Sequence, residues 1–271
     1  MNERLRSAAR RRDWARQWGP AAALIAGLLV LWEVGVRLTD APPWLLPAPS
    51  AVAAAFVDAG PQLWQHTGRT LVETAAGLLA SVVTGVALAV AVDLLPPLRR
   101  AIYPLLVVSQ TIPIIALAPL LVVWFGFGLL PRVLVVTLVC FFPIVISTAQ
   151  GLAAADPDMV ALLSSMGADR WMVFRKVRLP GALPAALSGL RIAATYAVMG
   201  AVISEWIGAS QGLGVFMIRS ANSYLTARLF AAIALTSVLS IALFGLVVLL
   251  ERWAVPWYFA ARREERWEEM R

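Results

Sequence analysis

Residues 156–180 read DPDMVALLSSMGADRWMVFRKVRLP, and this polar insert interrupts a chain that is otherwise strongly apolar. Seven of its residues carry charge, so it cannot cross the hydrocarbon core of a bilayer, where charged side chains are costly. It is also too regularly patterned for an irregular loop. A membrane protein that devotes so long a stretch to a structured insert is expected to present that insert to a partner.

The insert carries the start and stop signals of two short helices. Asp156 is suited to cap the first helix, and Gly167 can end it in the left-handed conformation that glycine tolerates. Asp169 can cap a second helix over residues 170–177, which we expect the run Leu179–Gly181 to break. Each helix has an apolar side, made of Met159, Leu162, Leu163 and Met166 in the first and of Trp171, Phe174 and Val177 in the second. The pattern alone leaves two interpretations open: a surface that binds a partner, and a helix pair that lies on the membrane surface.

The composition is typical of a membrane protein with many spans. Of the 271 residues, 60% are apolar and 14% are charged, and the mean hydropathy is +0.77. The formal net charge of +7 points to basic cytoplasmic loops rather than to a nucleic acid partner. The only cysteine, Cys140, and the only histidine, His66, stand apart in the sequence. We therefore predict no disulfide, no metal site and no catalytic residues.

Six apolar segments are each long enough to cross the roughly 30 Å of hydrocarbon in a bilayer. They are Pro20–Leu38, Val72–Val92, Ile102–Phe125, Pro131–Gln150, Pro184–Ser204 and Leu229–Leu250. The expected fold class is therefore an all-α polytopic membrane protein with six transmembrane helices. The first segment follows a basic stretch and could belong to a signal peptide. It is long, however, and no clean A-x-A cleavage site follows it, so we expect it to be retained.

The distribution of Lys and Arg predicts the orientation of the chain. With a cytoplasmic N-terminus, 17 of these 23 residues fall on the cytoplasmic side and 4 on the outer side or its edges. Because cytoplasmic segments carry such an excess, we expect both termini and the insert in the cytoplasm. The predicted organisation is a basic cytoplasmic segment over 1–19, a six-helix transmembrane domain over 20–250 that includes the insert at 156–180, and a cytoplasmic tail over 251–271.

The spacing within the insert resembles the cytoplasmic signature of permease subunits in binding-protein-dependent ABC importers. In that family a Glu-Ala-Ala triplet is followed after three residues by Gly, and after nine more by an aliphatic residue, any residue, Leu and Pro. Gly167, Val177, Leu179 and Pro180 fall on this spacing. The triplet positions hold Ala161–Leu163, so the Glu is missing while the helix–glycine–helix shape is kept.

Further segments resemble the same family. Residues 109–128 and 45–50 are similar to permeases for nitrate, sulfonate, taurine and bicarbonate. Residues 204–208 and 212–214 resemble permeases for thiamine-precursor pyrimidines or riboflavin. The resemblance covers roughly residues 40–260. It implies a type I ABC importer permease fold in a bacterial inner membrane. It also implies a substrate that is either a pyrimidine or riboflavin-like compound or a small anion such as nitrate, a sulfonate or taurine.

The resemblance also implies a role for the insert and a set of partners. It identifies the insert as the coupling helix, which seats in a cleft of a cytoplasmic ATPase subunit. An extracytoplasmic substrate-binding protein and a second copy of the chain are the other implied protein partners. The residues expected at the ATPase are Leu162, Leu163, Met166, Gly167, Ala168, Asp169, Trp171, Phe174, Val177, Leu179 and Pro180. ATP and Mg²⁺ are expected on the ATPase, because this chain has no Walker lysine pattern; it is expected to bind no cofactor and to be no enzyme.

Polar and helix-breaking residues within the spans mark a candidate translocation path, because they are costly in lipid and therefore face protein or water. The candidates are Ser109, Gln110, Thr111, Pro113, Thr195, Tyr196 and Glu205. Pro113 and Pro119 predict a bent third span, although the two prolines could serve packing alone. Glu205 could instead pair with Arg219 or Arg228 in the outer loop.

Other charged residues within the spans are interpreted as structural. Glu33 is expected to pair with Arg37 one turn further along the same helix. Arg191 is expected to extend its long side chain toward the cytoplasm.

Three other function classes are weighed against an ATP-driven permease. An ion-coupled secondary transporter usually shows inverted repeats and ionisable residues buried in the middle of its spans, and the sequence shows neither clearly. A membrane-embedded enzyme needs a cluster of catalytic side chains, and none is visible. A membrane scaffold without transport activity stays open as an alternative.

Overall fold

Long apolar helices form the body of the protein in the computed structural model, which describes residues 2–258 and the side chains of 19–95 and 97–258. The helices are α1 (Asn2–Leu38), α2 (Pro49–Asp58), α3 (Gly60–Leu94), α4 (Pro96–Ser109), α5 (Ile114–Phe125), α6 (Leu129–Ala153), α7 (Pro157–Ser165), α8 (Arg170–Val173), η1 (Phe174–Arg178), α9 (Leu179–Glu205), α10 (Leu213–Asn222) and α11 (Thr226–Ala254). Over this range the structure contains no strand, so the predicted all-α class is confirmed. The end of the predicted tail, residues 259–271, lies outside the described residues.

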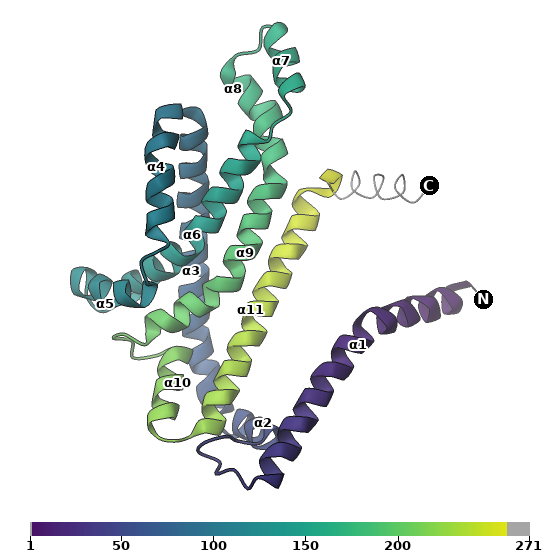
Figure 1. Cartoon of the computed structure of the whole chain (residues 1–271), viewed down its shortest axis with the longest axis vertical. Coiled ribbons are helices and arrows are strands. Elements are labelled where there is room, and N and C mark those ends of the chain that lie inside the picture. Colours follow the sequence, from purple (N-terminus) through teal and green to yellow (C-terminus); the bar gives the residue numbers. More distant parts are fainter. Residues whose placement is uncertain (1, 259–271) are drawn as a thin grey trace.

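The predicted spans correspond to five continuous apolar helices and one broken pair within the described range. The continuous ones are Gly19–Leu38, Gly60–Leu94, Leu129–Ala153, Arg170–Glu205 and Thr226–Ala254. The third predicted span is formed by α4 and α5, which meet at 102° (Figure 1). Pro113 causes this break, because a proline disfavours helical geometry in the residue before it. Pro113 itself is extended, with φ −63° and ψ 121°, and starts α5. The bend predicted for this span is therefore confirmed.

Glycines allow α3, α6 and α9 to pack closely at the centre of the bundle. A Cβ atom at Gly77 of α3 would overlap the side chain of Val136 on α6. A Cβ atom at Gly189 of α9 would lie 2.6 Å from the carbonyl oxygen of Pro143 on α6. Small residues at helix crossings are typical of membrane proteins, where dispersion contacts replace the hydrophobic effect. Cys140 is buried here and its thiol donates to the carbonyl of Ala193 at 3.4 Å, as a packing residue would.

Helix α1 stands apart from the bundle along most of its length (Figure 1). It is attached at its C-terminal end through Glu33, whose carboxylate accepts hydrogen bonds from the backbone N–H of Ser50 at 3.0 Å and from its hydroxyl at 2.8 Å. The predicted pairing of Glu33 with Arg37 is confirmed at 2.6 Å. Apolar side chains such as Leu31, which is 70% exposed, therefore remain available to lipid or to another subunit.

The insert continues directly into the fifth span. The predicted break at Leu179–Gly181 is wrong, because Arg170–Glu205 forms one helical run with a π-helical turn at Phe174–Arg178. In that turn the N–H of Leu179 bonds to the carbonyl of Phe174, five residues back. This wider turn relieves the clash that a proline ring makes with the preceding carbonyls, so the helix passes through the prolines that follow.

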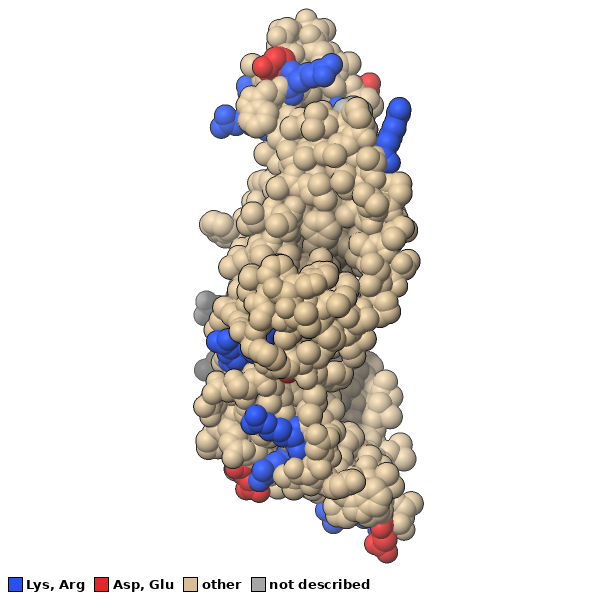
Figure 2. All heavy atoms as spheres, turned by 90° about the vertical axis from the view of Figure 1, so that its left-hand side faces the viewer, with Lys and Arg blue, Asp and Glu red and all other residues tan. Residues whose placement is uncertain are grey.

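Charged residues within the helical bundle are paired across helices. Arg191 on α9 bonds to Glu251 on α11 at 2.8 Å, and the Glu251 side chain is 4% exposed. The Arg191 side chain thus extends toward the end of the last helix that is expected to be cytoplasmic, and it has a partner there that the sequence did not indicate. On the face shown in Figure 2, charged side chains gather near the insert and in the lower half, with an uncharged band between them.

Candidate functional site

The insert, formed by α7, α8 and η1, projects from one end of the bundle (Figure 1), and α7 has an exposed apolar side. The carboxylate of Asp156 caps α7 by accepting from the N–H of Asp158 at 2.8 Å. Met159, Leu162 and Met166 lie along one side of this helix and are 48%, 54% and 73% exposed. Such a contiguous apolar surface on a capped helix is typical of a protein or membrane interaction site.

Gly167 turns the chain between the two helices of the insert. Its φ of +82° is the left-handed conformation expected from the sequence, and a Cβ atom added there would meet no heavy atom within 4 Å. The carboxylate of Asp169 then caps α8 by accepting from the N–H of Met172 at 2.8 Å. Both predicted caps and the predicted glycine turn are confirmed, so the shape of the insert is fixed by local interactions.

The second half of the insert anchors it to the bundle. Phe174 is buried against Leu152 and Ala182, while Trp171 remains 59% exposed and stacks on Phe174 with ring centroids 5.4 Å apart. Among the other predicted coupling residues, Leu163, Ala168, Val177, Leu179 and Pro180 are half-buried. The predicted set therefore divides into an exposed surface and a buried base.

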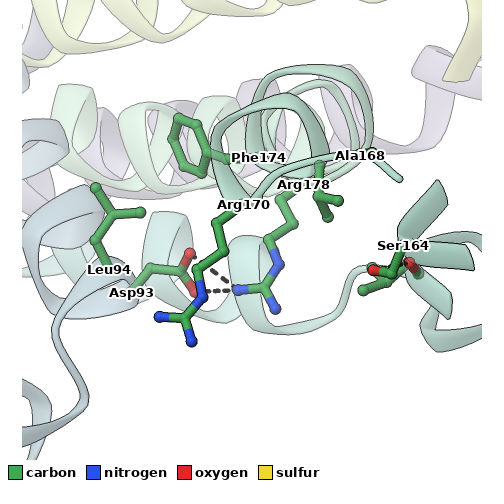
Figure 3. Close-up of a pocket in the computed structure, with 9 residues that line it drawn as sticks. Asp93, Leu94, Ser164, Ala168, Arg170, Phe174 and Arg178 are labelled. Carbon is green, nitrogen blue, oxygen red and sulfur yellow. Dashed lines mark hydrogen bonds and ion pairs between the residues drawn. The ribbon is translucent and has the colours of Figure 1, made fainter. Parts of the chain in front are cut away.

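An ion pair joins the insert to the end of α3. Arg178 Nη1 lies 3.2 Å from both carboxylate oxygens of Asp93. A cavity of about 370 Å³ lies beside this pair, and Figure 3 shows Arg170 next to Asp93 and Arg178 at its wall. Sequence reasoning missed Asp93, because nothing local relates it to an arginine 85 residues away.

A second, larger cavity of about 820 Å³ lies between the broken pair α4–α5 and helices α6 and α9. Four predicted pathway residues line it, namely Ser109, Gln110, Pro113 and Tyr196. Thr111 and Thr195 do not line it, and their hydroxyls donate to the backbone carbonyls of Val108 and Ile192, three residues back, at 2.8 Å. The broken helix thus contributes both its polar residues and its proline to the cavity wall.

Sequence reasoning missed the contribution of α6 to this cavity. Phe141, Phe142, Pro143 and Ser147 line it. Pro143 and Ser147 carry the same signal that identified residues 109–113, a proline and a hydroxyl within an apolar span, and the same rule would have found them.

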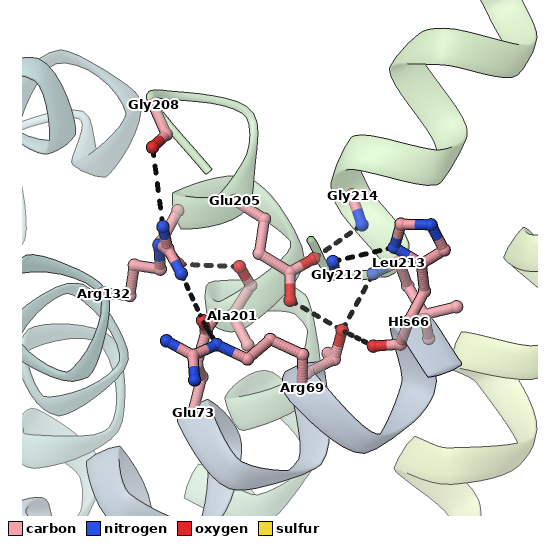
Figure 4. A network of polar contacts seen from close by, with 12 residues as sticks. His66, Arg69, Glu73, Arg132, Ala201, Glu205, Gly208, Gly212, Leu213 and Gly214 are labelled. Carbon is pink, nitrogen blue, oxygen red and sulfur yellow. Dashed lines mark hydrogen bonds and ion pairs between the residues drawn. The ribbon is translucent and has the colours of Figure 1, made fainter. Parts of the chain in front are cut away.

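Glu205 lies away from this cavity, in a buried polar network at the other end of α9 (Figure 4). Its carboxylate accepts from the Thr70 hydroxyl and from the N–H of Gly214, each at 2.6 Å. The N–H of Leu213 in turn donates to Thr70 Oγ1 at 2.9 Å. Glu205 is 1% exposed, so here it holds α3, α9 and the start of α10 together.

Arg219 in the outer loop is one of the alternative partners that the sequence predicts for Glu205. In the structure Arg219 donates to the carbonyl of Ser210 at 3.3 Å, and the two donors to Glu205 come from elsewhere. The expected outer-loop ion pair is therefore not the interaction that holds this carboxylate.

A buried ion pair lies next to Glu205 in the same network. Arg132 Nη1 on α6 is 2.7 Å from Glu73 Oε1 on α3, and Arg69 Nε is 3.1 Å from the same oxygen. The Glu73 side chain is 0% exposed and that of Arg132 is 8% exposed. Sequence reasoning did not pair Arg132 with Glu73, because the partners are 59 residues apart.

Gly212→Ala is expected to destabilise this network by about 2–3 kcal/mol, because two unfavourable effects add. The φ of Gly212 is +131°, a conformation that residues with a side chain rarely adopt, and a Cβ atom there would overlap the carboxyl group of Glu205. The measurement is the melting temperature of the purified protein in detergent.

Gly245→Ala is the matched control for this prediction. Gly245 lies in α11 with no heavy atom within 4 Å of the added Cβ, so its replacement should leave stability unchanged or slightly higher. Equal melting temperatures for the two variants would contradict the packing argument at Gly212.

Comparisons with known proteins agree with this arrangement. Residues 81–255 match the family described as binding-protein-dependent transport system inner membrane component. The formylaminopyrimidine transport permease protein ThiX of Halalkalibacterium halodurans is 39% identical over 85% of this chain and 92% of its own length. The riboflavin transport system permease protein RibX of Chloroflexus aurantiacus is 34% identical over 95% of this chain and 96% of its own. The taurine transport system permease protein TauC of Escherichia coli is 33% identical over 95% and 97%.

A solved structure shares the fold. The inward-facing methionine ABC transporter MetNI aligns with a TM-score of 0.64 at 20% sequence identity, covering 72% of this chain and 97% of the aligned chain. The helical bundle is thus a type I ABC importer permease fold, and the protein is a multi-pass protein of the inner membrane. The match over residues 81–255 and the relatives above 30% identity together place this chain in the family of inner membrane permease components of binding-protein-dependent ABC transporters.

Proposed function

We propose that this chain is the permease subunit of an ATP-driven importer and that its insert binds in a groove of a cytoplasmic ATPase. The observation that carries the proposal is the exposed apolar side of α7, formed by Met159, Leu162 and Met166 on a helix capped at both ends. A helix with such a surface fits an apolar groove in a partner. ATP and Mg²⁺ would be held by that ATPase, and this chain would supply no cofactor-binding residue.

The basic residues around the insert support its cytoplasmic location. Arg170, Arg175, Lys176 and Arg178 all lie within it. Because positive charge accumulates on cytoplasmic loops, we place this end of the bundle, and with it both termini, in the cytoplasm. The opposite end, formed by α2, α10 and their loops, would then receive the solute from an extracytoplasmic binding protein.

A second copy of the chain would complete the gate. The large cavity is lined by α4, α5, α6 and α9, and apolar side chains on α4 and α5, such as Leu105 and Val123, are 63% and 77% exposed. Packing two copies would bury such surfaces and enclose the cavity between them.

The continuous helix from Arg170 to Glu205 could transmit a movement of the insert to the rest of the bundle. Its first turns belong to the insert, Tyr196 lies in the wall of the large cavity, and Glu205 lies in the polar network at the far end. A movement of the insert would therefore shift the cavity wall without an intervening hinge. ATP-driven closure of the two ATPase subunits would switch the bundle between outward and inward access.

Two of the chemical classes named among the relatives are candidates for the substrate. One class is the ring compounds formylaminopyrimidine and riboflavin, and the other contains taurine and aliphatic sulfonates. We carry both classes as candidates for the solute that this permease moves.

Reconstitution tests the proposal. The neighbouring genes are searched for an ATPase and a binding protein, and these are placed in proteoliposomes with the chain. Uptake of riboflavin, a 4-aminopyrimidine and taurine is then measured with and without ATP. We expect uptake of one of them only when all three proteins and ATP are present. The matched control is an ATPase subunit whose Walker lysine is replaced, which should give no uptake.

The same assay separates the rival functions. Uptake that persists without ATP while an ion gradient is maintained would indicate a secondary transporter and would overturn the proposal. Cellular uptake that is unchanged when the ATPase gene is removed would indicate a scaffold without a transport role.

A further inference from the structure

The large cavity between α4–α5, α6 and α9 has a wall without charge. Within the part of the chain that the structure describes, none of the residues lining it is Lys, Arg, His, Asp or Glu. The nearest ion pair in sequence on α9, Arg191 with Glu251, connects α9 to α11 and does not belong to this wall. The cavity volume of about 820 Å³ is in the range of sites that hold small organic molecules.

The same wall carries aromatic rings and uncommitted hydrogen-bonding groups. Phe141, Phe142 and Tyr196 contribute rings from two helices. Among the described residues, the side chains of Gln110, Ser147 and Tyr196 form no hydrogen bond with another residue. An amide and two hydroxyls are thus free to donate to and accept from a solute, while the rings can pack on a flat molecule.

We propose that this cavity takes a neutral, planar ring compound with several hydrogen-bonding groups, such as a substituted pyrimidine or an isoalloxazine, and disfavours sulfonates and small inorganic anions. The proposal rests on the proposed permease function and adds the substrate class to it. An ion that enters a largely apolar cavity loses its hydration and finds no opposite charge in this wall. A neutral ring loses less on leaving water, and stacking and hydrogen bonds compensate for that loss.

The start of α5, which lies in the cavity wall, favours an anion. The N-terminus of α5 begins at Pro113, in the cavity wall, and the free N–H groups of a helix start attract negative charge. The helix start provides only a partial positive charge at one point of the wall. A sulfonate that has lost its water needs hydrogen bonds or positive charge around all three of its oxygens. The neutral compound is therefore favoured, and a binding measurement can compare the loss of hydration of an anion with its attraction to the helix start.

Direct binding to the purified complex tests the proposal without the binding protein, whose own selectivity would hide that of the cavity. The complex of permease and ATPase in lipid nanodiscs is titrated with riboflavin and a 4-aminopyrimidine, and ethanesulfonate and taurine are added as competitors. We expect saturable binding of at least one ring compound that a hundredfold excess of either sulfonate does not displace.

Tyr196→Ala is expected to weaken this binding about tenfold, because the ring that stacks on the solute is lost. Tyr196→Phe, which keeps the ring, should weaken it less. Thr195→Ala is the matched control, since Thr195 precedes Tyr196 on α9 and its hydroxyl bonds to its own helix. Size-exclusion profiles of the variants show whether each remains folded.

Three results would overturn the proposal: binding of a sulfonate in preference to the ring compounds, binding of neither class, or equal effects of Tyr196→Ala and Thr195→Ala. The ATPase rate of the same complex, measured with the binding protein present, keeps the two proposals apart. If a sulfonate stimulates the ATPase, the substrate class is wrong and the permease function stands. If no solute stimulates it, the permease function itself fails.

Discussion

Leu162→Asp is expected to abolish ATP-driven uptake while the permease stays folded and membrane-inserted. Leu162 lies on the apolar side of α7, 54% exposed and without a structural role in the bundle. In the proposed assembly this side is buried in a groove of the ATPase, where an aspartate would be a charge without a partner. We expect the ATPase to bind at least 30-fold more weakly, which corresponds to about 2 kcal/mol. The measurement is co-purification of the ATPase with tagged permease, together with uptake.

Ala161→Asp is the control for this prediction. Ala161 is the preceding residue and is also exposed, but at helical spacing it points away from the side formed by Met159, Leu162 and Met166. It introduces the same charge into the same helix, so it should retain most of the binding and uptake. If both variants lost the ATPase equally, the effect would come from charge near the membrane and not from a specific groove.

Arg132→Leu is expected to lower the stability of the folded bundle by about 3–5 kcal/mol. Arg132 is the buried partner of Glu73, and the Glu73 carboxylate has no exposed surface. Removing the arginine leaves this carboxylate with Arg69, which is 36% exposed at its side chain and 3.1 Å away. A buried charge that loses a close partner is costly because neither water nor the protein replaces the interaction.

Arg69→Leu is the comparison that isolates burial. It removes a charge from the same carboxylate but from a partly exposed position, where ion pairs contribute about 1 kcal/mol or less. Thermal unfolding in detergent, followed by size exclusion, should place the melting temperature of the Arg132 variant well below that of the Arg69 variant. The double variant Glu73→Leu with Arg132→Leu should recover part of the loss, and similar melting temperatures for all three would refute this account.

The two predictions concern opposite ends of one helical run. The first acts on α7, next to the start of the run at Arg170, and the second acts on the network beside Glu205, where the run ends. In the proposed mechanism a rigid element between these ends is required, because a flexible joint at Pro180 would absorb the movement of the insert. The π-helical turn at Phe174–Arg178 keeps that joint helical.

Much of the insert could be predicted from the sequence because its signals are local. Asp156 and Asp169 cap helices whose first N–H groups lie two or three residues away. Gly167 takes the left-handed conformation because residues with a Cβ atom are penalised there. The spans follow from the length and hydropathy of each segment alone, and the break at Pro113 follows from the geometry of proline. The coupling role of the insert stays a prediction.

Only the tertiary structure decided which distant groups meet. Glu73 with Arg132, Asp93 with Arg178 and Arg191 with Glu251 are pairs separated by 59, 85 and 60 residues. In the structure Glu205 lies in a buried polar network and not in the large cavity, and residues of α6 line that cavity. Capping, turn geometry and span length depend on neighbouring residues, so short stretches of sequence determine them. Pairing and cavity shape depend on how whole helices pack, and many packings share the same local signals until the side chains interlock.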